Sequence, residues 1–343
     1  MIFLGDVASP HNELPKVNYS FGKKPVVLNL EGPLVESSDV ASELLKEPVL
    51  FNHCSILDYM SSENVVAVNL ANNHINDIPK GFSKTVELIE ESNVGWFGLR
   101  HHDSISLSEH LFEGVKYILI GFGWDVIQCD YNRSGEYGVA PLSKSIILRE
   151  VEKLKTNNPD AKIIVNFHWN YEMELYPQPG HRSLAQDAID TGADAIIGHH
   201  PHVVSGIEIY NGKPIVYSLG NWWLPQGVFI NGQLKYNDMT HRQLAFRFDA
   251  AGEHELYWFT YDPSRKDVNF DFKESLSGSE LVKKLTPFDG MSKDDYQAWF
   301  KKNRLKKALL PIFKNEDHKF RNKVKSKFVK YRHPLVLLIR RFV

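Results

Sequence analysis

The chain has 343 residues, 43% of them hydrophobic and 24% charged, a composition that excludes a disordered, collagenous or coiled-coil protein. Its two cysteines, Cys54 and Cys129, are too few for a disulfide framework or a cysteine-rich zinc module. The formal charge of −2 combines +13 over residues 301–343 with −15 over residues 1–300, so a basic tail follows an acidic body.

Short apolar runs rich in β-branched residues alternate with segments of helical period. Most of the runs are apolar throughout, which is typical of strands that are buried on both faces. This alternation predicts an α/β fold in which helices connect the strands, with a late hairpin at the far side of the sheet. We expect strands at 2–4, 26–30, 65–70, 116–122, 162–167, 195–198 and 214–219, helices at 81–91, 143–155 and 182–190, and the hairpin at 243–248 and 255–261.

Polar side chains follow six of the predicted strands at the points where those strands end. In an open α/β sheet, the carboxyl ends of parallel strands meet at one edge, and ligands bind there. We therefore expect these polar residues to line one crevice. They are Asp6, the segment 29–33, the segment 72–74, His168 with Trp169, the segment 199–202 and the segment 218–221.

Each of these residues taken alone has a simpler interpretation. Asp6 is also a typical helix cap, and Asn29 with Glu31 can shape a turn before a proline. An isolated His168 is commonly a hydrogen-bonded, half-buried histidine. The pair His200 and His202 is more informative, because imidazoles two residues apart on an irregular turn can bind one metal ion.

The whole set offers carboxylate, amide and imidazole groups and no thiolate. Oxygen ligands are preferred by hard divalent ions, and imidazole ligands by borderline ones. The sequence therefore predicts a site for one or two divalent metal ions. The expected ligands are Asp6, Glu31, Asn73, His168, His200 and His202.

The order and spacing of these motifs resemble those of the CapA family of bacterial capsule and poly-γ-glutamate synthesis proteins, within the calcineurin-like metallophosphoesterase superfamily. The resemblance covers roughly residues 1–265. It implies a layered sandwich of mixed β-sheets flanked by helices. The pattern changes after about residue 265, and we expect a basic, mostly helical C-terminal extension over 266–343. The motifs that carry it are Gly5-Asp6, 29–33, 70–74 with Asp77 and Gly81, His168-Trp169 with Glu172 and Pro177, 198–202, and 217–221.

The resemblance also implies roles for single residues. Asp6 is similar to the first aspartate of a metallophosphoesterase, Asn73 with His74 to its Asn-His pair, and His168 to its mid-chain histidine. His200 and His202 are similar to its Gly-His-x-His element, and Glu31 stands near the position of a bridging aspartate. This sequence departs from the pattern in two ways, because Asp6-Val7-Ala8 replaces Asp-x-His and a glutamate replaces the aspartate. The number of bound ions is therefore open.

Ions at such a site, whether Mn, Zn, Fe or Mg, lower the pKa of a water that attacks a phosphorus or carbonyl centre. We expect His74 to be the general acid for the leaving group. Glu172 is the second catalytic candidate, because it can orient His168 or bind a cationic substrate group, although it can also be a plain surface carboxylate.

Three further residues next to the expected crevice, Trp169, Asn221 and Trp222, are candidates for substrate binding. The two indoles can stack on a sugar, but aromatic residues at strand ends are also common at the edge of a core.

These features predict a metal-dependent hydrolase or transferase acting on a phosphoester, or on an amide or ester of a polymer, in the synthesis of a capsule or another extracellular polymer. The expected partner is that polymer or its precursor. The alternative is a non-catalytic polymer-binding or assembly subunit of a capsule synthesis complex. The missing histidine of Asp-x-His and the basic tail favour this alternative.

The basic tail holds 15 Lys or Arg and 2 acidic residues. Segments 299–310 and 319–331 have helical period, and Pro311 and Pro334 are expected to end them. In the second segment an apolar stripe is flanked by cations. One interpretation is binding of residues 299–343 to an anionic membrane surface. A second is packing of the stripe on the acidic body, and nucleic acid is the least favoured partner. The stripe consists of Phe320, Val324, Phe328 and Tyr331.

The ends of the chain carry no pattern of a membrane-crossing segment. The first residues lack the basic start and apolar run of a secretory signal. The apolar run at 335–339 is far shorter than the roughly 20 residues that span a bilayer. We therefore expect a cytoplasmic protein, or one that is peripheral on the inner face of the membrane.

Overall fold

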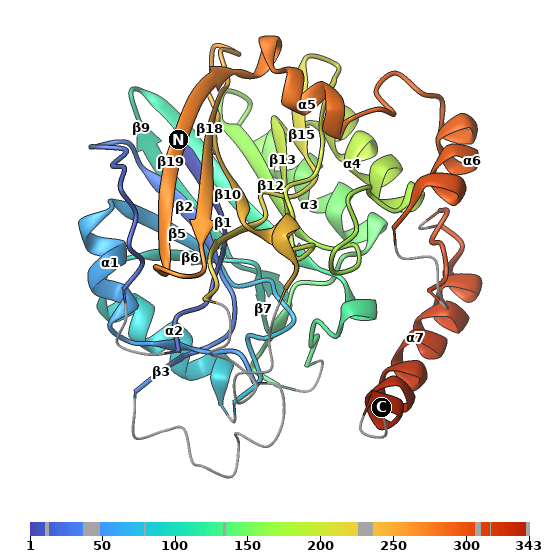
Figure 1. Ribbon diagram of the computed structural model, residues 1–343, viewed down its shortest axis with the longest axis horizontal. Helices are drawn as coiled ribbons and strands as arrows, with labels where there is room; N and C mark the ends of the chain where they lie inside the picture. Colours follow the sequence, from blue (N-terminus) through green and yellow to red (C-terminus); the bar gives the residue numbers. More distant parts are fainter. Residues whose placement is uncertain are drawn as a thin grey trace.

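The computed structural model describes residues 1–10, 14–36, 49–78, 80–132, 135–225, 236–305, 310–315 and 317–340. Two large mixed β-sheets lie face to face, and helices cover the outer side of each (Figure 1). The predicted layered α/β sandwich of mixed sheets is therefore confirmed.

The first sheet has the strand order β19-β18-β17-β1-β2-β5-β6, and β16 pairs with the end of β1. Neighbouring strands among β1, β2, β5 and β6 are parallel, whereas β17, β18 and β19 continue the sheet in antiparallel fashion. The predicted late hairpin is β17–β18. The bounds are β1 Ile2–Val7, β2 Val26–Leu30, β5 Val65–Asn69, β6 Gly95–Phe97, β16 Asn221–Trp223, β17 Arg242–Arg247, β18 Glu255–Asp262 and β19 Asp267–Ser275.

The second sheet has the order β14-β15-β13-β12-β10-β9. Its four central strands are parallel, and an antiparallel strand closes each edge. The bounds are β9 Leu107–Phe112, β10 Val115–Gly123, β12 Lys162–His168, β13 Ala195–His199, β14 Ile207–Tyr210 and β15 Lys213–Val216. Two small sheets consist of β3 Leu34–Val35 with β4 Asn52–His53, and of β11 Tyr137–Val139, β7 Leu99–His101 and β8 Ser104–Ile105.

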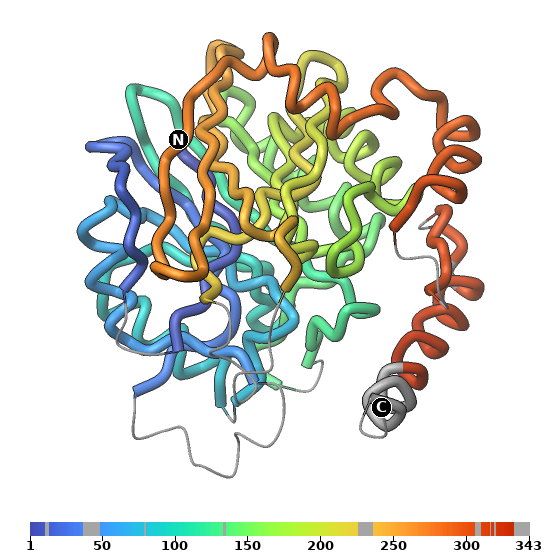
Figure 2. Tube along the Cα trace, in the orientation of Figure 1, coloured from blue at the N-terminus to red at the C-terminus, as the bar shows by residue number. Residues whose placement is uncertain are grey.

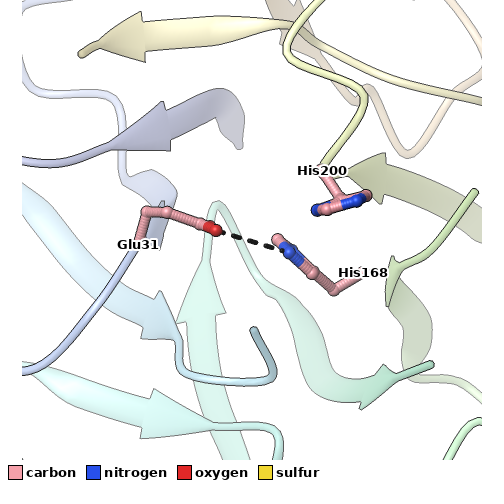
Figure 3. A group of neighbouring side chains, drawn as sticks. All are labelled: Glu31, His168 and His200. Atoms are coloured by element: carbon pink, nitrogen blue, oxygen red, sulfur yellow. Dashed lines mark ion pairs between the residues drawn. The ribbon is translucent and has the colours of Figure 1, made fainter. Parts of the chain in front are cut away.

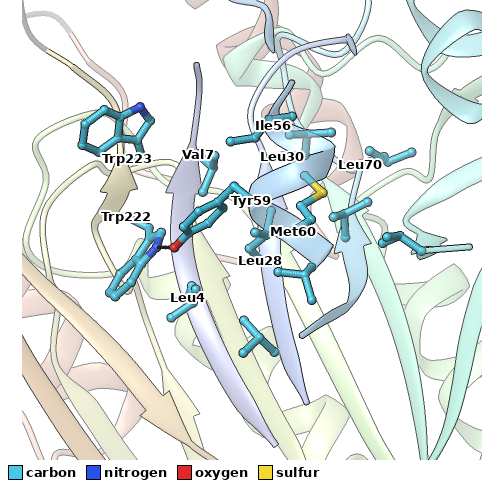
Figure 4. Packing of buried hydrophobic residues seen from close by; sticks show 14 of the residues in the cluster. Leu4, Val7, Leu28, Leu30, Ile56, Tyr59, Met60, Leu70, Trp222 and Trp223 are labelled. Carbon is cyan, nitrogen blue, oxygen red and sulfur yellow. Dashed lines mark hydrogen bonds between the residues drawn. The ribbon is translucent and has the colours of Figure 1, made fainter. Parts of the chain in front are cut away.

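Alternate side chains of the central strands enter different cores. In β1, Ile2 and Leu4 pack with residues of the helices α1 (Ile56–Ser62) and α2 (Gly81–Glu91). Phe3, between them, packs with the inner side chains of the second sheet. Both faces of the strand are therefore apolar, as expected for a strand without a solvent face. Around α1, Nε1 of Trp222 donates to the hydroxyl of Tyr59 at 2.9 Å (Figure 4).

The outer face of the second sheet packs against α3 (Lys144–Asn157) and α4 (Pro179–Thr191). Residues of the tail complete this layer, because α6 (Lys293–Asn303) packs against α4 (Figure 2). The short helix α5 (Glu280–Leu285) precedes α6. The expected division between 1–265 and 266–343 stays a prediction. β19 begins at Asp267, just after the expected boundary at residue 265, and it hydrogen-bonds to β18.

Both helices predicted in the tail have different bounds in the structure. α6 begins at Lys293, because Oγ of Ser292 accepts from the backbone of Asp295, and it ends before Arg304, whose φ of −58° and ψ of 141° are not helical. Residues 306–309 of that prediction lie outside the described residues. α7 spans Lys319–Arg340 and passes through Pro334, so the expected stop there is wrong. An internal proline removes one backbone hydrogen bond, and the turns on either side remain helical.

Among the described residues, no helix combines the length and the apolar character that crossing a membrane requires.

Candidate metal centre

Polar residues from the ends of strands in both sheets meet in the interior of the molecule. Nε2 of His168, at the end of β12, lies 2.8 Å from Oδ1 of Asn73, which follows β5. The backbone N–H of His200, after β13, donates to Oδ2 of Asp6 in β1 at 3.2 Å. The strand ends therefore converge as expected, but from two facing sheets and not along one edge.

A row of buried polar side chains crosses the first sheet at this level. Asp6, Asn29 and Asn69 are register partners on β1, β2 and β5. Nδ2 of Asn69 donates to Oδ1 of Asn29 at 2.9 Å, and Nδ2 of Asn29 donates to Oδ1 of Asp6 at 2.9 Å. The same Nδ2 donates to Oε2 of Glu31 at 2.7 Å. Asn29 therefore holds the two buried carboxylates in position.

Glu31, His168 and His200 form a group of possible metal ligands at this point (Figure 3). Each is buried, and one ligand atom from each lies within 4.8 Å of the others. Oε1 of Glu31 lies 3.5 Å from Nε2 of His168. Among the described residues, Oε1 of Glu31, Nδ1 of His168 and Nδ1 of His200 have no hydrogen-bond partner. A buried polar atom without a partner is costly, and a bound cation removes that cost.

The electrostatics of this group also fit a cation. Burial and the negative charge of Asp6 raise the pKa of Glu31 to about 8. Burial lowers the pKa of His168 and of His200 well below the ordinary value, and neighbouring histidines add to this effect. Both imidazoles are therefore neutral and keep a lone pair for a metal. The positive charges of His74 and His202 offset only part of the effect on Glu31, and a divalent ion supplies the charge that favours the carboxylate form.

Asp6 and His202 lie beside this group. Burial alone would raise the pKa of Asp6, but its close contacts with the rings of His199 and His202 hold it well below the ordinary value. The distances from the carboxylate to Nδ1 are 3.3 Å for both histidines. Burial tends to lower the pKa of His202. Its contact with Asp6 has the larger, opposite effect, so the pKa is raised to about 9. Nδ1 of His202 also lies 2.9 Å from Oδ1 of Asn221, and its Nε2 has no partner among the described residues.

The backbone around the two histidines is strained. His200 has a φ of +93° and His202 a φ of +59°, in the left-handed region that residues other than glycine rarely adopt. Such conformations cost about 1–3 kcal/mol each and cluster at functional sites. The strain is consistent with a loop held in place so that these side chains face the site.

His74 lies close enough to the group for its charge to affect Glu31 and His200. Nδ1 of His74 lies 2.7 Å from Oδ2 of Asp77, and 18% of the side chain is exposed. Burial lowers the pKa of His74, but Asp77 outweighs this effect, so the pKa is raised. The raised pKa favours the protonated imidazole and the carboxylate of Asp77 orients the ring, as a proton donor requires.

Glu172 is exposed, and no hydrogen bond to His168 is found among the described residues. Its charge raises the pKa of His74 and of His202, so it lies on the solvent side of the same group.

Trp169 and Trp222 are fully buried, in two different cores. Nε1 of Trp169 donates to the carbonyl of Tyr217 at 3.0 Å. Of the two interpretations that the sequence allowed for these indoles, burial favours core packing and not stacking on a sugar.

The sequence prediction did not assign a role to the buried amides. Asn69 and Asn166 each interrupt an otherwise apolar strand at the level of the site, as Asn29 does. Oδ1 of Asn166 lies 3.4 Å from Nε2 of His199. A single amide inside a fully apolar strand was the signal available in the sequence, because such a group needs a buried polar partner.

The model of the family described as bacterial capsule synthesis protein PGA_cap matches residues 20–226. The capsule biosynthesis protein CapA of Bacillus anthracis is 27% identical over 66% of this chain and 60% of its own length. The PGA biosynthesis protein CapA of Bacillus subtilis (strain 168) is 28% identical over 79% of this chain and 68% of its own length. The chain thus spans about two thirds of the length of these relatives.

Among solved structures, the calcineurin-like phosphoesterase YfkN from Bacillus subtilis is 13% identical and covers 87% of this chain and 98% of its own, with a TM-score of 0.41.

Proposed function

Because the chain belongs to the family of bacterial capsule synthesis proteins, we propose that it is a metal-dependent hydrolase or transferase that acts in the synthesis of a capsule or another extracellular polymer. The bond that it acts on is a phosphoester, or an amide or ester of the polymer.

One observation carries this proposal. Glu31, His168 and His200 each bring one ligand atom to within 4.8 Å of the others at the junction of two sheets, and each has a buried polar atom without a hydrogen-bond partner among the described residues. A protein that used these residues only for packing would have no reason to bury them without partners.

In the proposed site, Glu31, His168 and His200 hold the ion, and Asn73, Asp6 and His202 lie within reach of the same region. A divalent ion supplies Lewis-acid chemistry, polarising a substrate oxygen and making a water more acidic. Asn29 keeps both carboxylates in place. His74, whose Nδ1 faces Asp77, has its Nε2 available to give a proton to the leaving group.

A second candidate function is that of a polymer-binding or assembly subunit without turnover. Its support is that Ala8, which stands where the Asp-x-His pattern has its histidine, is a fully buried apolar residue. In addition, hydrogen bonds and ion pairs already engage both carboxylate oxygens of Asp6. A site with few ligands is compatible with binding a polymer without cleaving it.

The test combines metal analysis with activity. Protein purified without chelator is analysed for bound metal, and hydrolysis of bis(4-nitrophenyl) phosphate and 4-nitrophenyl phosphate is measured with Mn²⁺ and Zn²⁺. We expect bound metal, turnover that chelator abolishes, and loss of turnover in His74→Ala and in His168→Ala. His110→Ala, a histidine on β9 outside the site, is the matched control and should keep full activity.

The two variants separate the two functions. Under the enzyme proposal, His168→Ala loses metal and turnover, while His74→Ala keeps the metal and loses turnover. Bound metal with no turnover of either compound, together with binding of capsule-type polymer that survives His74→Ala, supports the second candidate. Absence of bound metal, with no rise in melting temperature on adding Mn²⁺, contradicts the metal site itself.

A further inference from the structure

Helix α7 carries an apolar face that points away from the body of the protein. Phe320 and Tyr331 are 80% and 79% exposed, and Val324 and Phe328 are 53% and 49% exposed. Their spacing of four, four and three residues places all four on one side of the helix. We call these four residues the outer face of α7.

The opposite side of the helix holds α7 on the body. Ser326 is buried, Val329 packs against the core of the second sheet, and Nζ of Lys325 donates to the carbonyl of Ile312 at 2.7 Å. Nζ of Lys330 lies 3.4 Å from Oδ2 of Asp125. The interpretation in which the apolar stripe packs on the acidic body is therefore wrong, because other residues make that contact. The exposed fractions show that the outer face remains uncovered. α7 is the red helix of Figure 1.

Cations flank the outer face on both sides. Seven positions between 319 and 332 are Lys or Arg, and none is Asp or Glu. Arg321, Lys323 and Lys327 are exposed, and within the described part of the chain they form no ion pair. The helix therefore presents a row of aromatic and aliphatic side chains between unpaired positive charges, on a protein whose body is acidic.

We propose that the outer face of α7 docks onto an anionic lipid surface. Shallow insertion of Phe320, Val324, Phe328 and Tyr331 removes their apolar area from water, while the flanking Lys and Arg reach the anionic headgroups. An acidic polymer accounts for the cations but not for the exposed apolar side chains, and nucleic acid, whose bases can stack on aromatic rings, leaves the exposed aliphatic Val324 without a role. A second copy of the chain would bring two sets of like charges together.

The experiment is flotation of the full-length chain with vesicles of phosphatidylcholine alone and with about one third phosphatidylglycerol. We expect binding to the anionic vesicles only, weakened at least tenfold in the double variant Phe320→Ser/Phe328→Ser and in Lys323→Glu/Lys327→Glu. Both pairs are solvent-exposed, so the fold, checked by circular dichroism and melting temperature, should be retained. Leu111→Ser, an exposed apolar residue on β9 that is 77% exposed, is the matched control and should bind like the wild type.

Each other outcome overturns the proposal. If the lysine variant loses binding and the phenylalanine variant binds like the wild type, the contact is purely electrostatic. Tighter binding to poly-glutamate or to DNA than to vesicles assigns the cations to a polyanion. A dimer in solution without lipid that dissociates in the phenylalanine variant assigns the face to a second copy. Because vesicle binding needs no turnover, its failure leaves the proposed enzymatic function untouched.

Discussion

Asn221 holds a proton on Nδ1 of His202, since its Oδ1 lies 2.9 Å from that nitrogen. Oδ2 of Asp6 forms an ion-pair contact with the same nitrogen at 3.3 Å. With Nδ1 occupied by two acceptors, the buried Nε2 is the only ring nitrogen of His202 that can bind a metal, and it has no partner among the described residues. Partners of this kind orient a histidine ligand and raise its affinity.

Removing this orienting contact should weaken metal binding. We expect Asn221→Ala to lower the affinity for Mn²⁺ by about 10–100-fold, the usual effect of losing a group that orients a ligand. Asn221→Asp keeps an acceptor for Nδ1 and should bind Mn²⁺ far better than the alanine variant. Isothermal titration calorimetry measures both. Equal Mn²⁺ affinity in wild type and Asn221→Ala would show that His202 takes no part in the site.

His181 should make the protein sensitive to acid. Burial against Trp124 and Trp169 lowers the pKa of His181 to about 3, whereas in the unfolded chain it is about 6.5. Between these values the unfolded chain binds a proton that the folded protein excludes. The contribution of this neutral histidine to the free energy of unfolding is fully present above pH 6.5. It falls by about 1.4 kcal/mol per pH unit below that pH.

The variant His181→Phe keeps an aromatic ring in this position and cannot be protonated. We expect its free energy of unfolding to fall less between pH 6.5 and pH 4.5 than that of the wild type, as measured by urea denaturation. His101→Phe, which changes a more exposed histidine, should leave the wild-type slope unchanged. The explanation fails if His181→Phe and the wild type lose stability in parallel.

Gly5 should tolerate no side chain, because β1 and β16 meet there. A Cβ at Gly5 would lie 2.0 Å from the carbonyl oxygen of Gly220, which accepts from the backbone of Asp6 at 3.0 Å. Overpacking of this kind costs about 1–3 kcal/mol or more. We therefore expect Gly5→Ala to lower the free energy of unfolding by at least that amount and to weaken metal binding, because Asp6 moves with the strand.

Gly278→Ala is the matched control, since a Cβ there meets no atom within 4 Å. It should be neutral or slightly stabilising by denaturant unfolding. A Gly5→Ala protein as stable as the control would contradict the close approach of β1 and β16.

The strands and main helices of the body were predictable because their signal is local. The run at 26–30 is apolar on both sides of the strand, and it forms β2 with those bounds. The tail was harder to predict. Apolar residues at helical spacing gave no indication that α6 begins at Lys293, where a side-chain cap decides the boundary.

The candidate site shows the same limit. Motif order pointed to Glu31, His168 and His200, but no local pattern assigns Asn29 to the two carboxylates that it holds. That assignment depends on the register between β1 and β2, which is a property of the paired strands and not of either one.

By itself, the sequence determined the alternation of strands and helices, the polar residues at strand ends and the amphipathic character of α7, because each is a periodicity within a short stretch of chain. Only the tertiary structure decided that the site joins two sheets, that Trp169 and Trp222 belong to the core, and that the outer face of α7 stays uncovered. The physical reason is that burial depends on which distant segments pack together, and a local pattern holds no information about that choice.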